Sequence, residues 1–305
     1  MMTQRWGQLF DAAFLRQLEQ LTVASKRTVH TPSAGGRRSH RLGDGLEFAD
    51  HRDYAPGDNV RFVDWRYFAR MDRLLTRLFH EHREGGLAIL LDRSASMAGP
   101  AAQGPASAVF RRALRVSAIL AYVALVGHER LWLCPYAEAL EDPFRTAHRR
   151  EDIVAVMDVL AEVTPGGRAD LPGAVRRYLG LPSHPSAVII ISDLLDVGDG
   201  LGDALAMLSL AGCDTSVLHV TDAELVGRIG DGPVELVDAE TQRALSCSAS
   251  EALGESYRQQ LEACSDACRG VVTARGGVYV EAPLDQPLDE LVLLSLRRGG
   301  VLVGQ

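Results

Sequence analysis

The stretch that decides the fold is residues 86–97, which read Gly-Leu-Ala-Ile-Leu-Leu-Asp-Arg-Ser-Ala-Ser-Met. An apolar run over residues 87–91 stops abruptly at Asp92, and Ser94 and Ser96 follow at alternate positions. An apolar run of this length, bounded by glycines and polar residues, is typical of a strand buried on both faces of a parallel sheet. We therefore expect these three side chains on the loop at the strand's carboxyl end, where open α/β sheets bind ligands.

A second apolar run, residues 187–191, reads Ala-Val-Ile-Ile-Ile and ends in Ser192 and Asp193. If the two strands are parallel neighbours, Asp92 and Asp193 share one crevice. Carboxylates and hydroxyls are hard oxygen ligands, which suit Mg²⁺, Ca²⁺ or Mn²⁺. The alternative is structural: the serines cap the next helix and the aspartates lie near helix N-termini, with no cation involved.

Strands and helices alternate along most of the chain after residue 85, which predicts an α/β fold with a doubly wound, mostly parallel sheet. We assign residues 85–305 to this domain. Residues 1–84 form an N-terminal region with an amphipathic helix predicted over 8–24, a basic linker and a segment rich in Asp and Arg. The alternating charges of that segment favour either an ion-pair network that holds it in place or a face for a partner.

The first strand and its loop resemble the von Willebrand factor A domain, whose metal-ion-dependent adhesion site begins with Asp-x-Ser-x-Ser. By position, Asp92, Ser94 and Ser96 match that element, and Asp193 matches the aspartate that ends a later strand. The resemblance implies a Rossmann-type topology with an N-terminal extension. It also implies a divalent cation, Mg²⁺ first.

This sequence departs from that family at one ligand. The family's threonine falls on Ala169, which has no side-chain oxygen. Asp170 is adjacent, and we expect it to substitute, directly or through water. The alternative is a crevice that binds no metal.

A longer resemblance lies upstream. Residues 48–66 read Phe-Ala-Asp-His-Arg-Asp-Tyr-Ala-Pro-Gly-Asp-Asn-Val-Arg-Phe-Val-Asp-Trp-Arg. This run is similar to the hallmark of the domain-of-unknown-function 58 family, and the resemblance extends over roughly residues 37–215. It implies partnership with a MoxR-type AAA+ ATPase or its client, in the remodelling or maturation of another complex.

Composition limits the classes of function. Hydrophobic residues make up 47% of the 305 residues, which is ordinary for a globular protein, and the net charge of −8 argues against nucleic-acid binding. The start of the chain lacks the apolar core of a secretory signal. The chain also has no apolar run of about 18 residues, so we expect no membrane span and a cytoplasmic location.

Common nucleotide-binding and nucleophile motifs are missing from the sequence. The sequence has no Gly-x-x-x-x-Gly-Lys-Ser/Thr loop, no Gly-x-Ser-x-Gly elbow and no Gly-x-Gly-x-x-Gly after a strand. We therefore expect a non-enzymatic protein-interaction module with a partial metal-ion-dependent adhesion site. The alternatives are a metal-dependent hydrolase that uses the same crevice, and a scaffold whose metal site has decayed.

Overall fold

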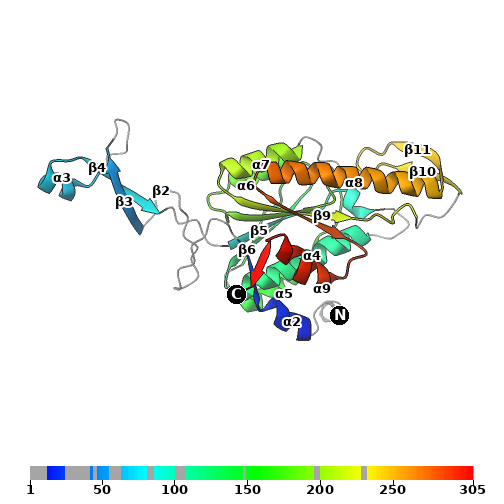
Figure 1. Cartoon of the computed structure of the whole chain (residues 1–305), viewed down its shortest axis with the longest axis horizontal. Helices are drawn as coiled ribbons and strands as arrows, with labels where there is room; N and C mark the ends of the chain where they lie inside the picture. Colours follow the sequence, from blue (N-terminus) through cyan, green and yellow to red (C-terminus); the bar gives the residue numbers. More distant parts are fainter. Residues whose placement is uncertain are drawn as a thin grey trace. The chain divides into compact units, whose positions relative to one another are not determined.

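The strand expected at residues 87–91 lies near the centre of a six-stranded sheet in the computed structural model (Figure 1). The strand order is β12-β9-β8-β5-β6-β7, and only the short edge strand β7 runs antiparallel to its neighbour. The strands are β5 (Gly86–Asp92), β6 (Arg130–Tyr136), β7 (Phe144–Arg145), β8 (Ala187–Ser192), β9 (Asp214–Thr221) and β12 (Val278–Pro283). The predicted α/β class and mostly parallel sheet are confirmed.

The structure describes residues 12–24, 42–43, 47–54, 63–80, 86–99, 107–146, 149–195, 200–227 and 232–304. These residues divide into two units, one formed by the start of the chain together with residues from 86 onward, and the other by residues between 26 and 85. The basic linker lies outside the described residues, as do residues 8–11 of the predicted N-terminal helix.

The sheet is buried on both faces, as the apolar runs predict. Leu87, Ile89 and Leu91 pack into one hydrophobic cluster, and Ala88 and Leu90 pack into the other. The alternation follows from the two-residue period of a strand, which sends successive side chains to opposite faces. Since neither face meets water, the run contains no polar residue before its end.

Helices cover both faces of the sheet. One face is covered by α4 (Ala108–Val126) and α5 (Ile153–Glu162), and the other by α6 (Leu171–Leu179) and α7 (Gly200–Leu210). The longest helix, α8 (Glu251–Ala274), lies with α6 and α7 in Figure 1. Short helical turns complete the unit: η2 (Ser96–Ala98), η4 (Arg150–Asp152), α9 (Leu288–Glu290) and the π-helical η5 (Leu291–Leu296).

The chain reverses its direction of travel across the sheet between β5 and β8. From β5 it moves to β6 and β7 on one side, and then returns to β8, β9 and β12 on the other. The first connections on the two sides therefore leave in opposite directions, which opens a crevice at the carboxyl ends of β5 and β8. This point is where the expected site residues lie.

The N-terminal helix belongs to the α/β unit, which corrects the division at residue 84. Helix α2 spans Ala12–Leu18, and the following residues form strand β1 (Leu21–Val23) rather than more helix. Strand β1 pairs antiparallel with β13 (Leu302–Gly304) near the chain's end. Leu18 and the strand's apolar residues are buried in the core beside α4, and that burial holds the segment to this unit.

The second unit contains a three-stranded antiparallel sheet in the order β2-β4-β3, with helix α3. Its elements are β2 (Leu42–Gly43), β3 (Glu47–Asp53), α3 (Trp65–Met71) and β4 (Leu75–His80). Asp64 accepts a hydrogen bond from the Tyr67 amide at 2.9 Å and so caps α3. Arg73 and Asp53 form an ion pair at 2.9 Å, but both side chains are largely exposed, so the pair stabilises the unit little.

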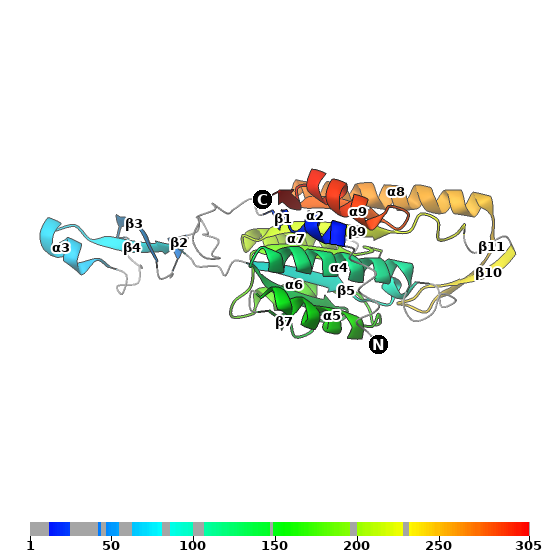
Figure 2. The ribbon, with the colours of Figure 1, turned by 90° about the horizontal axis from the view of Figure 1, so that it is seen from below.

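A hairpin interrupts the α/β pattern between β9 and α8. It consists of β10 (Gly232–Val237) and β11 (Ala244–Ala249), paired antiparallel along their whole length. Both views place this hairpin at the end of the unit where α8 begins (Figures 1 and 2). The hairpin thus stands at the carboxyl edge of the sheet, the edge that carries the crevice.

Candidate functional site

Asp92 joins the ends of the two central strands. Its carboxylate accepts a hydrogen bond from the Ser94 amide at 2.8 Å and another from the Ser192 hydroxyl at 2.6 Å. The side chain is 1% exposed, and this burial raises the pKa of Asp92, while the hydrogen bonds from Ser192 and Ser94 oppose the rise. Asp92 therefore fixes the serine loop against β8, and the sequence-based expectation that the two strand ends meet is confirmed.

The two loop serines lie in contact. Their Oγ atoms are 2.9 Å apart, Ser94 is fully buried, and Ser96 opens the η2 turn. This spacing makes a hydrogen bond, and it also equals the separation of adjacent ligands around octahedral Mg²⁺, about 2.9 Å for ligand distances near 2.0–2.1 Å. The pair is therefore already spaced as two neighbouring ligands of a hard cation.

The end of the η2 turn is fixed by Ser107. Its Oγ accepts a hydrogen bond from the Phe110 amide, which caps α4, and donates one to the Met97 carbonyl. One hydroxyl thus links the serine loop to the first turn of the helix that covers the sheet.

Asp193 follows β8 directly and is 6% exposed. Its backbone carbonyl accepts a hydrogen bond from His219 Nε2 at 2.8 Å. Because a carbonyl only accepts, Nε2 carries the proton, and Nδ1 of the neutral ring accepts from the Tyr279 hydroxyl at 2.7 Å. Burial lowers the pKa of His219 to about 4, so the ring is neutral at pH 7. The next residue, Leu194, has a φ of 53°, a backbone conformation that residues other than glycine seldom adopt.

The loop before α6 lies beside the serine loop through backbone hydrogen bonds. The Gly166 amide donates to the Arg93 carbonyl at 2.7 Å, and the Ala95 amide donates to the Gly167 carbonyl at 2.8 Å. Gly167 has a φ of 81°, which requires glycine in this tight approach. These bonds hold the loop that carries Ala169, the position of the threonine in the von Willebrand factor A resemblance, beside the serine loop.

Ala169 and Asp170, the residues at the position of the family's threonine, make contacts other than those expected of metal ligands. Ala169 offers only its backbone. Asp170 is exposed and caps α6, because its carboxylate accepts a hydrogen bond from the Gly173 amide at 2.9 Å. Its role as a ligand stays a prediction.

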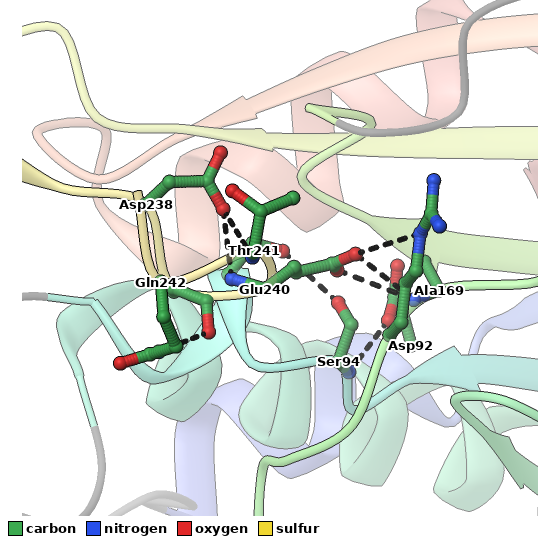
Figure 3. Close-up of polar contacts among 10 residues, drawn as sticks. Asp92, Ser94, Ala169, Asp238, Glu240, Thr241 and Gln242 are labelled. Atoms are coloured by element: carbon green, nitrogen blue, oxygen red, sulfur yellow. Dashed lines mark hydrogen bonds and ion pairs between the residues drawn. The ribbon is translucent and has the colours of Figure 1, made fainter. Parts of the chain in front are cut away.

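A carboxylate that the sequence analysis missed lies at Ala169. Glu240, in the turn of the β10–β11 hairpin, has a side chain that is 1% exposed. The Ala169 amide donates to its two carboxylate oxygens at 3.2 and 3.3 Å, and Arg168 Nε lies 3.8 Å from one of them. Figure 3 shows the Glu240 side chain pointing from the hairpin toward Ala169, on the side where Asp92 and Ser94 lie.

Tyr136 is a second residue that the sequence analysis did not assign to the site. It pairs with Asp92 in the register of β6 and β5, and its hydroxyl is buried beside the side chains of Asp92 and Ser192. Burial and the neighbouring carboxylate of Asp92 raise its pKa well above the ordinary value.

The donor set fits a hard divalent cation in its chemistry. Two serine hydroxyls, with Asp92 and Asp193 beside them, offer only oxygen, the ligand that Mg²⁺ and Mn²⁺ prefer. Among the described residues, no group of three or more His, Cys, Asp or Glu side chains could hold a metal ion. The fit therefore depends on the serine hydroxyls rather than on a cluster of carboxylates.

A groove adjoins the serine pair. It is lined by Ser96 and Asp193, by polar residues at the end of β9, and by apolar side chains from β9, α4, α8 and the segments that follow β8 and β9. The apolar members are Val109, Leu195, Val220, Leu225 and Leu261. The crevice thus combines oxygen donors with an apolar wall, the usual composition of a binding site.

The fold and the site define a von Willebrand factor A-like α/β protein, with the serine loop at its topological switch point. The chain belongs to the family described as "Protein of unknown function DUF58", whose model matches residues 50–266. No curated protein matches the chain.

Two solved structures are similar in part. The conserved hypothetical protein BatB from Bacteroides thetaiotaomicron is 16% identical, with a TM-score of 0.41, over 70% of this chain and 98% of that one. An aerotolerance-related membrane protein from Bacteroides fragilis, with multiple mutations to serines, is 15% identical, with a TM-score of 0.34, over 63% of this chain and 98% of that one. Among the residues described for the present chain, no helix has the length and apolar character to cross a membrane.

Proposed function

We propose that this protein is a non-enzymatic interaction module. In this proposal the crevice at the ends of β5 and β8 binds a divalent cation, Mg²⁺ first, through the hydroxyls of Ser94 and Ser96. Asp92 and Asp193 hold the cation directly or through water. A vacant coordination position then accepts a carboxylate from a partner protein, because a hard cation with an open position attracts acidic side chains strongly.

The observation that supports this proposal most is the serine pair. The two hydroxyls are 2.9 Å apart, and Asp92 fixes their loop through two hydrogen bonds. Preorganised ligands lose little conformational freedom on binding, so such a pair binds a cation more tightly than two freely rotating serines.

The proposed partner is a MoxR-type AAA+ ATPase or its client, and this part rests on the family resemblance alone. The test is binding of the immobilised protein to a purified MoxR-type ATPase. The proposal predicts binding in Mg²⁺ that EDTA or the Ser96→Ala substitution abolishes. Equal binding with and without Mg²⁺ would contradict a metal-bridged contact.

Calorimetric titration of Mg²⁺ and Mn²⁺ tests the cation site itself. We expect binding to the full chain and loss of binding in a double variant, Ser94→Ala with Ser96→Ala. Ser209→Ala is the matched control, since Ser209 is an exposed serine on α7. Undiminished binding in the double variant, or no binding to the unmodified chain, would refute the site.

A further inference from the structure

Most side chains of the β10–β11 hairpin are exposed, but those of Glu240 in its turn and Ala249 at the end of β11 are buried. Its large apolar residues Leu236, Val237 and Leu245 are 36%, 52% and 65% exposed, whereas the Glu240 side chain is 1% exposed. Glutamate is among the residues that are almost never buried without a partner. The hairpin therefore places a carboxylate, and not its apolar surface, against the rest of the unit.

The turn is built to present that carboxylate. The Asp238 side chain accepts hydrogen bonds from the amides of Glu240 and Thr241 at 2.9 and 2.7 Å, and these bonds lower the pKa of Asp238. Gln242 takes a φ of 58°, and its side-chain amide donates to the Ala239 carbonyl at 2.9 Å. These local bonds fix the backbone of Glu240 in the turn (Figure 3).

The carboxylate ends at the loop that precedes α6, on the side where Asp92 and Ser94 lie (Figure 3). It accepts hydrogen bonds from Ala169, the position at which the von Willebrand factor A resemblance expects an oxygen ligand. The backbone bonds between residues 93–95 and 166–167 keep this position beside the serine loop. Glu240 thus brings an acidic side chain to the loop that lies beside the serines, which the proposed function assigns to the cation.

We propose that the crevice is a carboxylate-binding site that the chain fills with its own Glu240, and that a partner binds by displacing the hairpin with an acidic residue on a tight turn. This inference rests on the proposed function for the partner, but the internal contact stands without a cation. The adjoining groove accepts an apolar side chain next to the partner's acidic residue. We therefore expect the partner surface to carry an acidic residue on a tight turn, with an apolar side chain next to it.

The contacts of Glu240 with Ala169 and Arg168 have the geometry of weak interactions. One amide is shared between both Glu240 oxygens at 3.2 and 3.3 Å, and the 3.8 Å approach of Arg168, which is 74% exposed, is a loose ion pair. A two-stranded hairpin is marginally stable on its own. A cation at the serine pair attracts any carboxylate beside it. Mg²⁺ binding therefore stabilises the closed hairpin, and the closed hairpin raises the affinity for Mg²⁺ by the same factor.

Hydrogen exchange tests the internal contact. We expect Glu240→Ala to speed amide exchange across residues 232–249 and 166–170 of the full chain in EDTA, and Glu240→Gln to do so less. Glu235→Gln is the matched control, because Glu235 is an exposed glutamate on β10. Unchanged exchange in Glu240→Ala would overturn the proposal.

A peptide that copies residues 236–243, labelled for fluorescence anisotropy, tests the displacement. If the hairpin is closed about 90% of the time, the peptide binds the Glu240→Ala protein about tenfold more tightly than the unmodified chain. The same peptide with glutamine in place of Glu240 should bind neither. Equal affinity for the two proteins, or no binding to either, would overturn the proposal.

Titration of Mn²⁺ alone into the same two proteins separates this inference from the proposed function. Mn²⁺ binding without peptide binding would refute the internal ligand and leave the cation site intact. Peptide binding in EDTA without any Mn²⁺ binding would refute the cation site and support a carboxylate site that needs no metal.

Discussion

His219 makes the stability of the sheet depend on pH. The ring is fully buried at the end of β9, with Nε2 donating to the Asp193 carbonyl and Nδ1 accepting from Tyr279. A protonated ring would lose the acceptor at Nδ1 and would place a charge in the core. Burial accordingly lowers its pKa to about 4, from about 6.5 in the unfolded chain.

The sign and size of the effect follow from this difference. As the pH falls below 6.5, His219 becomes protonated in the unfolded chain but stays neutral in the folded protein. The folded protein is therefore less stable at lower pH. The loss begins near pH 7, reaches about 2 kcal/mol at pH 5, and levels off at about 3 kcal/mol below pH 4. Above pH 7 the contribution is fully present.

The assay is urea unfolding of the full chain and of His219→Gln at pH 7.5 and pH 5, both in EDTA. Glutamine keeps a donor and an acceptor but does not titrate, so other acidic groups contribute equally to both proteins. Between pH 7.5 and pH 5, we expect the free energy of unfolding of the unmodified chain to fall by about 2 kcal/mol more than that of His219→Gln. Parallel pH dependences would refute the buried neutral histidine.

Substitutions at three positions, Ser192, Leu90 and Asp170, test other parts of the structure by urea unfolding. Ser192→Ala removes a hydrogen bond to the buried Asp92 carboxylate and should cost about 1–3 kcal/mol and weaken Mn²⁺ binding; full stability would show that the bond does not hold the loop. Leu90→Ala opens a cavity in the sheet and should cost about 2–5 kcal/mol, whereas the control Leu210→Ala, at a site 78% exposed, should stay within about 0.5 kcal/mol. Equal costs would contradict the burial of β5. Asp170→Ala should cost about 1 kcal/mol through the lost cap of α6, and Asp170→Asn almost nothing, because asparagine caps equally well. Weaker Mn²⁺ binding in Asp170→Asn would support Asp170 as a ligand.

The sequence predicts the centre of the fold because its signal there is local. The two apolar runs that end at Asp92 and at Asp193 each form a strand buried on both faces, and a parallel pairing brings their ends together. Nothing beyond strand period and the polarity of the ends is needed for this part. The serine loop is a continuation of one of these strands, so its place follows as well.

The sequence does not predict contacts made by segments distant along the chain. Glu240 lies 71 residues after Ala169, on a hairpin whose own pattern shows an exposed turn. The only local signal is the Asp238-x-Glu240 turn, which explains how the carboxylate is presented but not what it meets. For the same reason the sequence does not assign the N-terminal segment to the α/β domain, because β1 pairs with β13 at the opposite end of the chain.

The most direct test of the central claim is the anomalous scattering of a crystal of the full chain grown with Mn²⁺. We predict an anomalous peak within about 2.2 Å of the hydroxyls of Ser94 and Ser96, with Asp92 still hydrogen-bonded to Ser192. A crystal with Mn²⁺ bound elsewhere, and the two serines hydrogen-bonded to each other as before, would contradict it.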